Sequence, residues 1–198
     1  GSLVDDECGV CGGGGADDGL CPNANCDGNC PQGTPVQFLF NQSTIQAFYY
    51  FNAVTIDGGS LEADDWVGSF NGENCVGAHK WDTTLCGGGV CAVVAMGDDG
   101  YEYTDGYCNI GDIPTFKIYD ASNNTYYDAV ALGSVNLNDG ECVGPVPECM
   151  GWSNQSMPRI DILENAVIGC TDATACNFIP EANVDDGSCW SAVDGCTC

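Results

Sequence analysis

The sequence contains very few basic residues. Lys80, Lys117 and Arg159 are the only ones, against 29 acidic residues, so the formal net charge is −26 at pH 7. Nucleic acids and anionic membranes carry phosphates and would repel such a chain. The net negative charge argues against nucleic acid as a partner and favours cations, Ca²⁺ first. The other explanation of the charge is solubility alone.

Long apolar runs and amphipathic helical patterns are also missing. No stretch is long and apolar enough to cross a membrane, so we expect no membrane insertion. Short runs rich in Phe, Tyr, Val and Ile alternate instead with Gly, Asn and Asp turns, which is typical of β-strands. Asn71-Gly72 between two such runs predicts a tight hairpin. We expect strands at 36–40, 46–56, 66–70, 74–78, 90–96, 115–119, 125–130, 133–137 and 159–163.

These runs predict an all-β fold with an antiparallel β-sandwich over residues 35–165. Residues 1–34 are rich in Cys, Gly and Asp, and residues 166–198 form a second cysteine-rich segment. Both contain few large apolar side chains and cannot fold by packing alone. We expect two loop-rich arms stapled by disulfides, with one short helical turn at Thr171–Cys176.

Sixteen cysteines are distributed five, six and five along the chain. So many thiols persist as disulfides only in an oxidising environment, which predicts an extracellular or cell-surface protein. Each terminal set is odd, so at least one bridge leaves each arm unless a thiol stays free. The arms could reach each other or the next molecule, and the central six form an even set. The cysteines expected in disulfides are Cys8, Cys11, Cys21, Cys26, Cys30, Cys75, Cys86, Cys91, Cys108, Cys142, Cys149, Cys170, Cys176, Cys189, Cys196 and Cys198.

Two segments resemble known spacers. Gly169-Cys170-Thr171-Asp172-Ala173-Thr174-Ala175-Cys176-Asn177-Phe178, continuing to Val184-Asp185-Asp186-Gly187-Ser188-Cys189, resembles a short cysteine repeat. Such repeats occur in large secreted and surface proteins of marine bacteria and some aquatic eukaryotes. Asp5-Asp6-Glu7-Cys8-Gly9-Val10-Cys11 is similar to an acidic spacer of the same proteins, and the central region to β-rich modules that accompany them. The resemblance implies an extracellular, modular, structural or adhesive setting, and it carries over no catalytic residues.

The sequence offers little for catalysis. His79 is the only histidine, so any Ser-His-Asp or Cys-His arrangement would depend on it, and a surface or rim position is the simpler interpretation. Cys8 and Cys11 form a CxxC pair without a second pair or a nearby histidine, which favours a disulfide over zinc. Paired carboxylates could hydrolyse glycosides, but 29 acids make such pairs common. We expect that the protein is not an enzyme.

Calcium and glycans are the candidate small ligands. Asp98, Asp99, Glu102 and Asp105 place four carboxylates in a Gly-rich, turn-rich stretch, which suits Ca²⁺ but lacks the EF-hand spacing. Asp17-Asp18 and Asp185-Asp186 are weaker candidates, and solvated turns explain all three equally simply. Three sequons, which begin at Asn41, Asn123 and Asn154, are candidate acceptors for N-glycans.

Aromatic side chains supply the alternative function. Tyr101, Tyr103 and Trp190 lie in polar contexts and are expected to be exposed, where they could stack on sugars, although most aromatics are core. The leading hypothesis is a protomer of an extracellular filament or surface layer, a homopolymer joined through its arms by added strands and disulfides. A monomeric carbohydrate-binding or adhesion module is the alternative. The other aromatic candidates are Trp66, Trp81, Trp152 and Tyr107.

Overall fold

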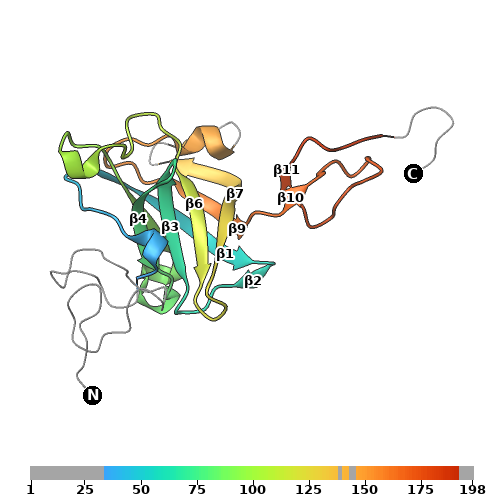
Figure 1. Ribbon diagram of the computed structural model, residues 1–198, viewed down its shortest axis with the longest axis horizontal. Helices are drawn as coiled ribbons and strands as arrows, with labels where there is room; N and C mark the ends of the chain where they lie inside the picture. Colours follow the sequence, from blue (N-terminus) through green and yellow to red (C-terminus); the bar gives the residue numbers. More distant parts are fainter. Residues whose placement is uncertain (1–33, 138–139, 143–145, 192–198) are drawn as a thin grey trace, which may run out of the picture.

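The computed structural model describes residues 34–137, 140–142 and 146–191 (Figure 1). The predicted N-terminal arm lies outside the described residues except for Thr34, and with it the Asp17-Asp18 site and five cysteines. Cys196 and Cys198 lie outside them as well. The described part is mostly β, as predicted, with a few single-turn 3₁₀ helices. None of those helices is long or apolar enough to span a membrane.

One nine-stranded sheet contains most of the described residues. Its strand order is β2-β1-β9-β7-β6-β3-β4, with β5 also paired to β1 and β8 to β7. The strands are β1 (Gln46–Ile56), β2 (Gly59–Ser60), β3 (Trp66–Asn71), β4 (Asn74–Lys80), β5 (Cys91–Met96), β6 (Thr115–Asp120), β7 (Thr125–Leu137), β8 (Gly140–Glu141) and β9 (Arg159–Asn165). Strands β3 and β4 form the hairpin predicted at Asn71-Gly72, with Gly72 at φ +59°.

The sheet differs from the expected antiparallel sandwich in two respects. Strand β7 pairs with β6 along its first half and with β9 along its second, so the ladder runs unbroken where two separate sheets were expected. A register shift between Leu132 and Val135, with Gly133 at φ +86°, bends β7 there, as bulges do. The sequence split this strand in two at the same place. The β1–β9 pair is parallel, so the sheet is not purely antiparallel.

The sheet curls until β5 meets β3 and β4. A Cβ on Gly77 of β4 would overlap the carbonyl oxygen of Val94 in β5, so glycine is what allows the two backbones to approach. The Ser69 hydroxyl in β3 donates a hydrogen bond of 2.5 Å to the same Val94 oxygen. A side chain therefore joins the strands at a point where no backbone ladder is formed.

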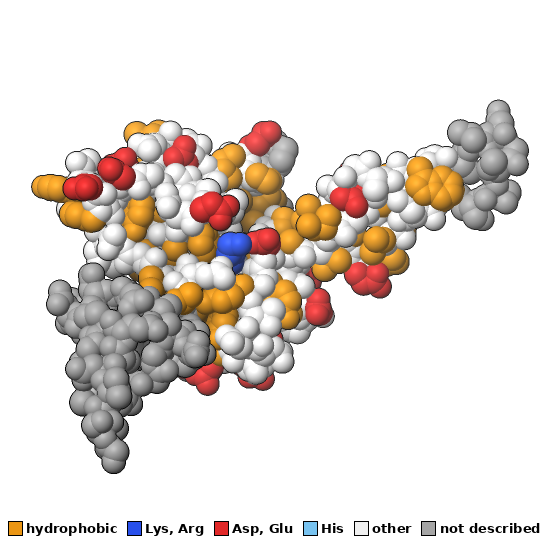
Figure 2. Space-filling view, viewed as in Figure 1, with side chains coloured by type: hydrophobic (Ala, Val, Ile, Leu, Met, Phe, Trp, Pro, Cys, Tyr) orange, Lys and Arg blue, Asp and Glu red, His pale blue; other side chains and the backbone are white. Residues whose placement is uncertain are grey.

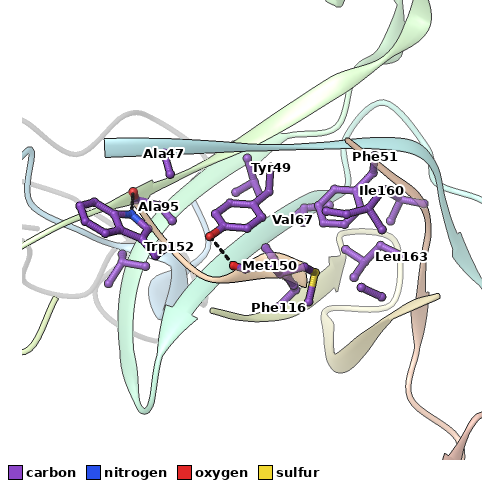
Figure 3. Close-up of a cluster of buried hydrophobic side chains, with 14 of the residues drawn as sticks. Ala47, Tyr49, Phe51, Val67, Ala95, Phe116, Met150, Trp152, Ile160 and Leu163 are labelled. Carbon is purple, nitrogen blue, oxygen red and sulfur yellow. Dashed lines mark hydrogen bonds between the residues drawn. The ribbon is translucent and has the colours of Figure 1, made fainter. Parts of the chain in front are cut away.

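The concave face of the curled sheet holds the main core (Figure 3). Tyr49 and Phe51 of β1 lie edge-on to Phe116 of β6, with ring centroids 5.5 and 5.1 Å apart. Two buried polar atoms are satisfied by backbone carbonyls. The Tyr49 hydroxyl donates to the Met150 oxygen and the Trp152 indole to the Ala95 oxygen, both at 2.8 Å. These bonds attach the segment after β8 to the sheet.

A smaller cluster lies on the outer face of β3 and β6. Phe38 packs edge-on against Phe70 and Tyr126, together with Cys75 and Tyr119. Phe38 belongs to a 3₁₀ helix, η2 (Val36–Phe38), where the sequence predicted a strand at 36–40. Pro35 begins this turn and its carbonyl accepts the Phe38 amide at 2.8 Å. Apolar residues here serve to cover the sheet, and their β propensity is overridden by that packing.

The C-terminal segment extends away from the sheet (Figure 1). It contains a two-stranded parallel pair, β10 (Ile168–Gly169) and β11 (Val184–Asp185), and the disulfide Cys170–Cys189. The expected helical turn at 171–176 is a hydrogen-bonded turn in which Asp172 accepts the Thr174 amide at 2.8 Å. The short 3₁₀ turns elsewhere are η3 (Thr83–Leu85), η4 (Gly87–Gly89), η5 (Glu102–Thr104) and η6 (Val146–Met150).

Candidate functional site

One site combines a disulfide, an imidazole and an open groove. The groove has a volume of about 640 Å³ and runs beside the end of β4, the turns η3 and η4, and the start of β5. Cys86 and Cys91, joined as a disulfide, lie in it. The His79 ring nitrogen and the two sulfurs all lie within 4.8 Å of one another. The sequence predicted His79 only as a surface or rim residue and did not associate it with this cysteine pair.

Local structure explains how the site forms. Asp82 caps η3 by accepting the Thr84 amide at 3.0 Å and the Thr84 hydroxyl at 2.6 Å, and these bonds lower the pKa of Asp82. The turn then brings Cys86 back over Asp82, whose carbonyl oxygen is 3.6 Å from the Cys86 sulfur. Three glycines follow, and Gly88 and Gly89 adopt positive φ, which leads the chain into β5 at Cys91.

The electrostatics of the groove differ from those of the rest of this acidic protein. Lys80 lines it and pairs with Asp64 at 2.5 Å. His79 is exposed, but the protein around its ring removes part of its hydration and lowers the pKa of His79, which leaves the imidazole neutral at pH 7. Because Cys86 and Cys91 are joined, their sulfurs are not thiolate ligands, and this group is not a metal site while the disulfide persists.

The cysteine prediction is right for some residues and wrong for two. Disulfides join Cys86 to Cys91, Cys142 to Cys149 and Cys170 to Cys189, and Cys176 is also disulfide-bonded. Cys75 and Cys108 are free thiols, so the central six do not all pair. The physical reason is location: Cys75 belongs to the outer-face cluster and Cys108 to the main core. Burial raises the pKa of both thiols to about 12.

The acidic stretch proposed for Ca²⁺ does not bring its carboxylates together. Among the described residues, the His79 group is the only set of three or more potential ligands within 4.8 Å. Asp99 uses its oxygens within the protein: one accepts the amide and hydroxyl of Thr44, the other the hydroxyl of Thr104. Asp98 accepts the Gly100 amide. Asp185 and Asp186 likewise cap their own turns, and Glu102 and Asp105 lie at η5.

All three sequons begin at exposed residues outside the strands. The Asn41 amide donates to the carbonyl oxygen of Tyr103 at 2.8 Å, and that of Asn123 to Asp120 at 2.7 Å. The Asn154 side-chain oxygen accepts the Gln46 amide at 3.1 Å. Each acceptor nitrogen is therefore at the surface, where a glycan could be attached without displacing core residues.

The aromatics that the sequence predicted to be exposed are exposed. Tyr101 and Tyr103 are 58% and 50% exposed and stack on one another, with centroids 5.5 Å apart and rings 5° from parallel. Trp190 is 54% exposed, on the C-terminal segment. The other candidates are not available as a platform: Trp81, Trp152 and Tyr107 are buried, and Trp66 is half-buried.

A second, larger groove lies along β4. It has a volume of about 910 Å³ and separates β4 from the segment that follows η2. Phe38, Trp66 and Ala78 supply apolar walls, and Glu73 and Asp105 lie among its lining residues. Thr34, the first described residue, also lines it. The sequence does not predict this groove, because the groove depends on where η2 and η5 are placed against the sheet.

Comparison with protein-family models, curated proteins and solved structures finds no match to this chain. The resemblance of residues 169–189 to secreted cysteine repeats therefore stays a sequence-based expectation. Three disulfides in the described residues agree with an oxidising, extracellular environment.

Proposed function

We propose that this protein is an extracellular structural protomer that assembles with copies of itself into a filament or surface layer. The observation that carries the proposal is the groove along β4. Among the described residues, β3 is the only strand hydrogen-bonded to β4, so the outer backbone edge of β4 has no ladder partner there. A groove with apolar walls beside such an edge suits the addition of an extended segment from another molecule.

The length and composition of the chain before the groove suit this role. Thirty-three residues precede Thr34, and fully extended they would span about 110 Å, far enough to reach a neighbouring domain. That segment is rich in Gly, Asp and Cys, and its nine glycines, which carry no side chain, fit close to a strand backbone. A contact from the start of one molecule to the β4 groove of the next is head-to-tail, and such contacts grow into fibres unless the rotation closes a ring.

The C-terminal segment supports a second contact. Ile168 is 67% exposed and Trp190 is 54% exposed, with Phe178 and Ile179 also at the surface. Figure 2 shows hydrophobic side chains along this segment where it leaves the body. A segment of this size with so little core of its own gains apolar burial when a neighbour covers it.

The charge of the protein sets a condition on assembly. Acidic side chains are scattered over the body and the C-terminal segment in Figure 2, whereas Lys and Arg are visible at one place. Copies with a net charge of −26 repel one another at low ionic strength. At about 0.15 M salt the Debye length is about 8 Å, so this repulsion acts only at close range. Assembly should therefore increase with salt.

The test compares groove variants by sedimentation velocity and electron microscopy at rising salt. Ala78→Arg places a long charged side chain in the groove, and Gln42→Arg does so from the exposed opposite wall, where folding is undisturbed. Ala53→Arg, at an exposed position of β1 that lines neither groove, adds the same charge elsewhere. Wild type and Ala53→Arg should form large species, and both groove variants should remain small. A monodisperse 20.6 kDa wild-type particle at every concentration and salt level would overturn the proposal.

A monomeric glycan-binding module is the second candidate, and the Tyr101–Tyr103 pair favours it. Parallel, half-exposed rings offer flat apolar surface of the kind on which sugar rings stack. Calorimetric titration with oligosaccharides identified on a glycan array would test this. Tyr101→Ala should weaken binding at least about tenfold if stacking contributes about 1.4 kcal/mol. Binding that is unchanged in Tyr101→Ala and Tyr103→Ala would eliminate this platform.

A further inference from the structure

We propose that the Cys86–Cys91 disulfide reacts by thiol–disulfide exchange. The thiol of an incoming cysteine attacks the sulfur of Cys86, and His79 transfers the proton. The inference about which residues react stands on the groove around His79 alone. The further step, that the thiol comes from a second copy and links subunits, rests on the proposed function.

The accessibility of the two sulfurs sets the direction of attack. Cys86 is half-buried at the wall of the groove, whereas Cys91 is 1% exposed at the start of β5 and packs in the main core. An incoming thiol therefore reaches the sulfur of Cys86 first. Access decides which sulfur is attacked in thiol–disulfide exchange, so attack at the more exposed Cys86 makes the buried Cys91 sulfur the leaving one.

The charges around this disulfide favour an anionic nucleophile more than those around the C-terminal one. Lys80 supplies a positive charge at the groove, and the carboxylate of Asp82 there accepts two hydrogen bonds from Thr84. The Cys189 sulfur, in contrast, lies 3.6 Å from a carboxylate oxygen of Asp185. Since the thiolate is the nucleophile, a carboxylate beside the target slows its approach. Two disulfides in one chain thus differ in their electrostatic surroundings.

His79 is placed to move the proton in both halves of the exchange. As a neutral imidazole it takes the proton of the incoming thiol, and the thiolate attacks the Cys86 sulfur. The Cys86–Cys91 bond breaks, and the Cys91 sulfur leaves and takes the proton from the imidazolium. The sum is one thiol plus one disulfide giving one mixed disulfide at Cys86 plus one thiol at Cys91, with no oxidant consumed. Protonation matters because a bare thiolate is costly in apolar surroundings.

The loop between the cysteines permits the sulfurs to separate. Residues 87–89 are all glycine, and a Cβ added to any of them would meet no atom within 4 Å. All three glycines are exposed, while Cys91 is held by the ladder of β5 with β1. Cys86 can therefore move with the loop after exchange while Cys91 stays in the core.

The thiol could come from a second copy or from a small molecule. The terminal cysteine sets are odd, so a copy has a thiol to offer if one stays unpaired. A small thiol such as glutathione has the same chemistry. The two sources are separated by testing them in different arms of one experiment, so that failure of subunit linkage does not remove the site.

In the first arm, the folded protein is incubated with reduced glutathione at pH 7.5, quenched with acid, and mapped by mass spectrometry. Glutathione should attach to Cys86 about tenfold or more faster than to Cys189, and His79→Gln should slow attachment at Cys86 by about tenfold or more. The effect of His79→Gln should shrink above about pH 9, where the attacking thiol ionises without help. Added imidazole should partly restore the rate in His79→Ala, which a merely structural role would not allow.

Three results would overturn the site: attachment to Cys189 as fast as to Cys86, attachment to Cys91, or equal rates in wild type and both His79 variants. In the second arm, concentrated protein without glutathione is run on non-reducing gels and its crosslinked peptides are mapped. Cys86 joined to a cysteine of a second copy supports subunit linkage. Reaction with glutathione but no crosslink at Cys86 overturns the linkage and leaves a site for small thiols.

Discussion

The hydroxyl of Ser69 lies 2.5 Å from the carbonyl oxygen of Val94 and donates a hydrogen bond to it. This contact joins β3 to β5 at the point where the curled sheet meets itself. Gly77, the cross-strand partner of Ser69 in β4, permits it by leaving room for the backbone of β5. The close approach of β5 to β3 and β4 thus depends on a glycine at 77 and on the hydroxyl of Ser69.

Gly77→Ala should therefore destabilise the fold strongly. The new methyl group would overlap the Val94 oxygen, so β5 must shift, and overpacking of this kind costs about 1–3 kcal/mol or more. Urea unfolding followed by Trp fluorescence measures the change. Gly87→Ala is the matched control, because its Cβ would meet no atom within 4 Å, and it should leave the unfolding midpoint nearly unchanged. Equal midpoints for the two variants would contradict the close approach of β4 and β5.

Ser69→Ala should cost less than Gly77→Ala and act through polarity. It removes the donor to Val94 without adding volume, and a buried carbonyl that loses its partner costs about 1–3 kcal/mol. Ser69→Thr keeps the hydroxyl and serves as the comparison, although its extra methyl adds some crowding. If Ser69→Ala unfolds at the wild-type urea concentration, the hydrogen bond does not contribute to closure of the sheet.

Asp99 makes stability depend on pH below pH 4. The amide of Thr44 is the largest cause that lowers the pKa of Asp99 to about 2, with hydroxyls adding to it. The unfolded value is about 3.9, so the stabilisation is fully present above that pH and is lost as pH falls through about 2. Asp99→Asn should lower the melting temperature at pH 7, and the gap to wild type should close between about pH 4 and pH 2. A gap of constant size over this range would contradict the role of the carboxylate.

The sequence predicted local structure well where pattern alone decides it. The strand expected at 46–56 is β1 with the same bounds, and the Asn71-Gly72 hairpin forms as expected. The strand expected at 36–40 is a turn, because Phe38 is needed over the outer face of β3. The joining of two expected strands into β7 and the parallel β1–β9 pair depend on contacts far apart in sequence, which residue pattern does not encode.

The candidate site shows the same limit. His79 and the Cys86–Cys91 pair are visible in the sequence, but only the path of η3 and η4 brings them within 4.8 Å. Counting thiols predicted an even set of six in the centre, whereas Cys75 and Cys108 lie in different clusters and stay free. Parity limits the possible pairings, and location decides among them.

Cys75 and Cys108 should be unreactive in the folded protein. Burial raises the pKa of each thiol to about 12, so almost none is thiolate at pH 8, and only 9% of Cys75 and none of Cys108 is exposed. Pulse alkylation with iodoacetamide followed by peptide mapping should label neither residue in buffer and both in 6 M guanidinium without reductant. Rapid labelling of either in buffer would mean that it is exposed, and absence of labelling in denaturant would mean that it is bridged.

Asn183 should control how firmly the C-terminal segment is attached to the sheet. Its side-chain oxygen accepts the Val167 amide at 2.8 Å, and its side-chain nitrogen donates to the carbonyl oxygen of Asn165 at 2.9 Å. Asn183→Ala removes these two bonds and a longer one of 3.3 Å to the Glu164 carboxylate, all next to the end of β9, at a cost of about 1–2 kcal/mol to that attachment. Limited proteolysis should then cut near 166–168 several times faster. The urea midpoint for unfolding of the body, followed by Trp fluorescence, should stay unchanged. Asn177→Ala, which removes bonds within the segment only, is the control and should leave cleavage near 166–168 unchanged. Equal cleavage rates in Asn183→Ala and wild type would show that other contacts hold the segment in place.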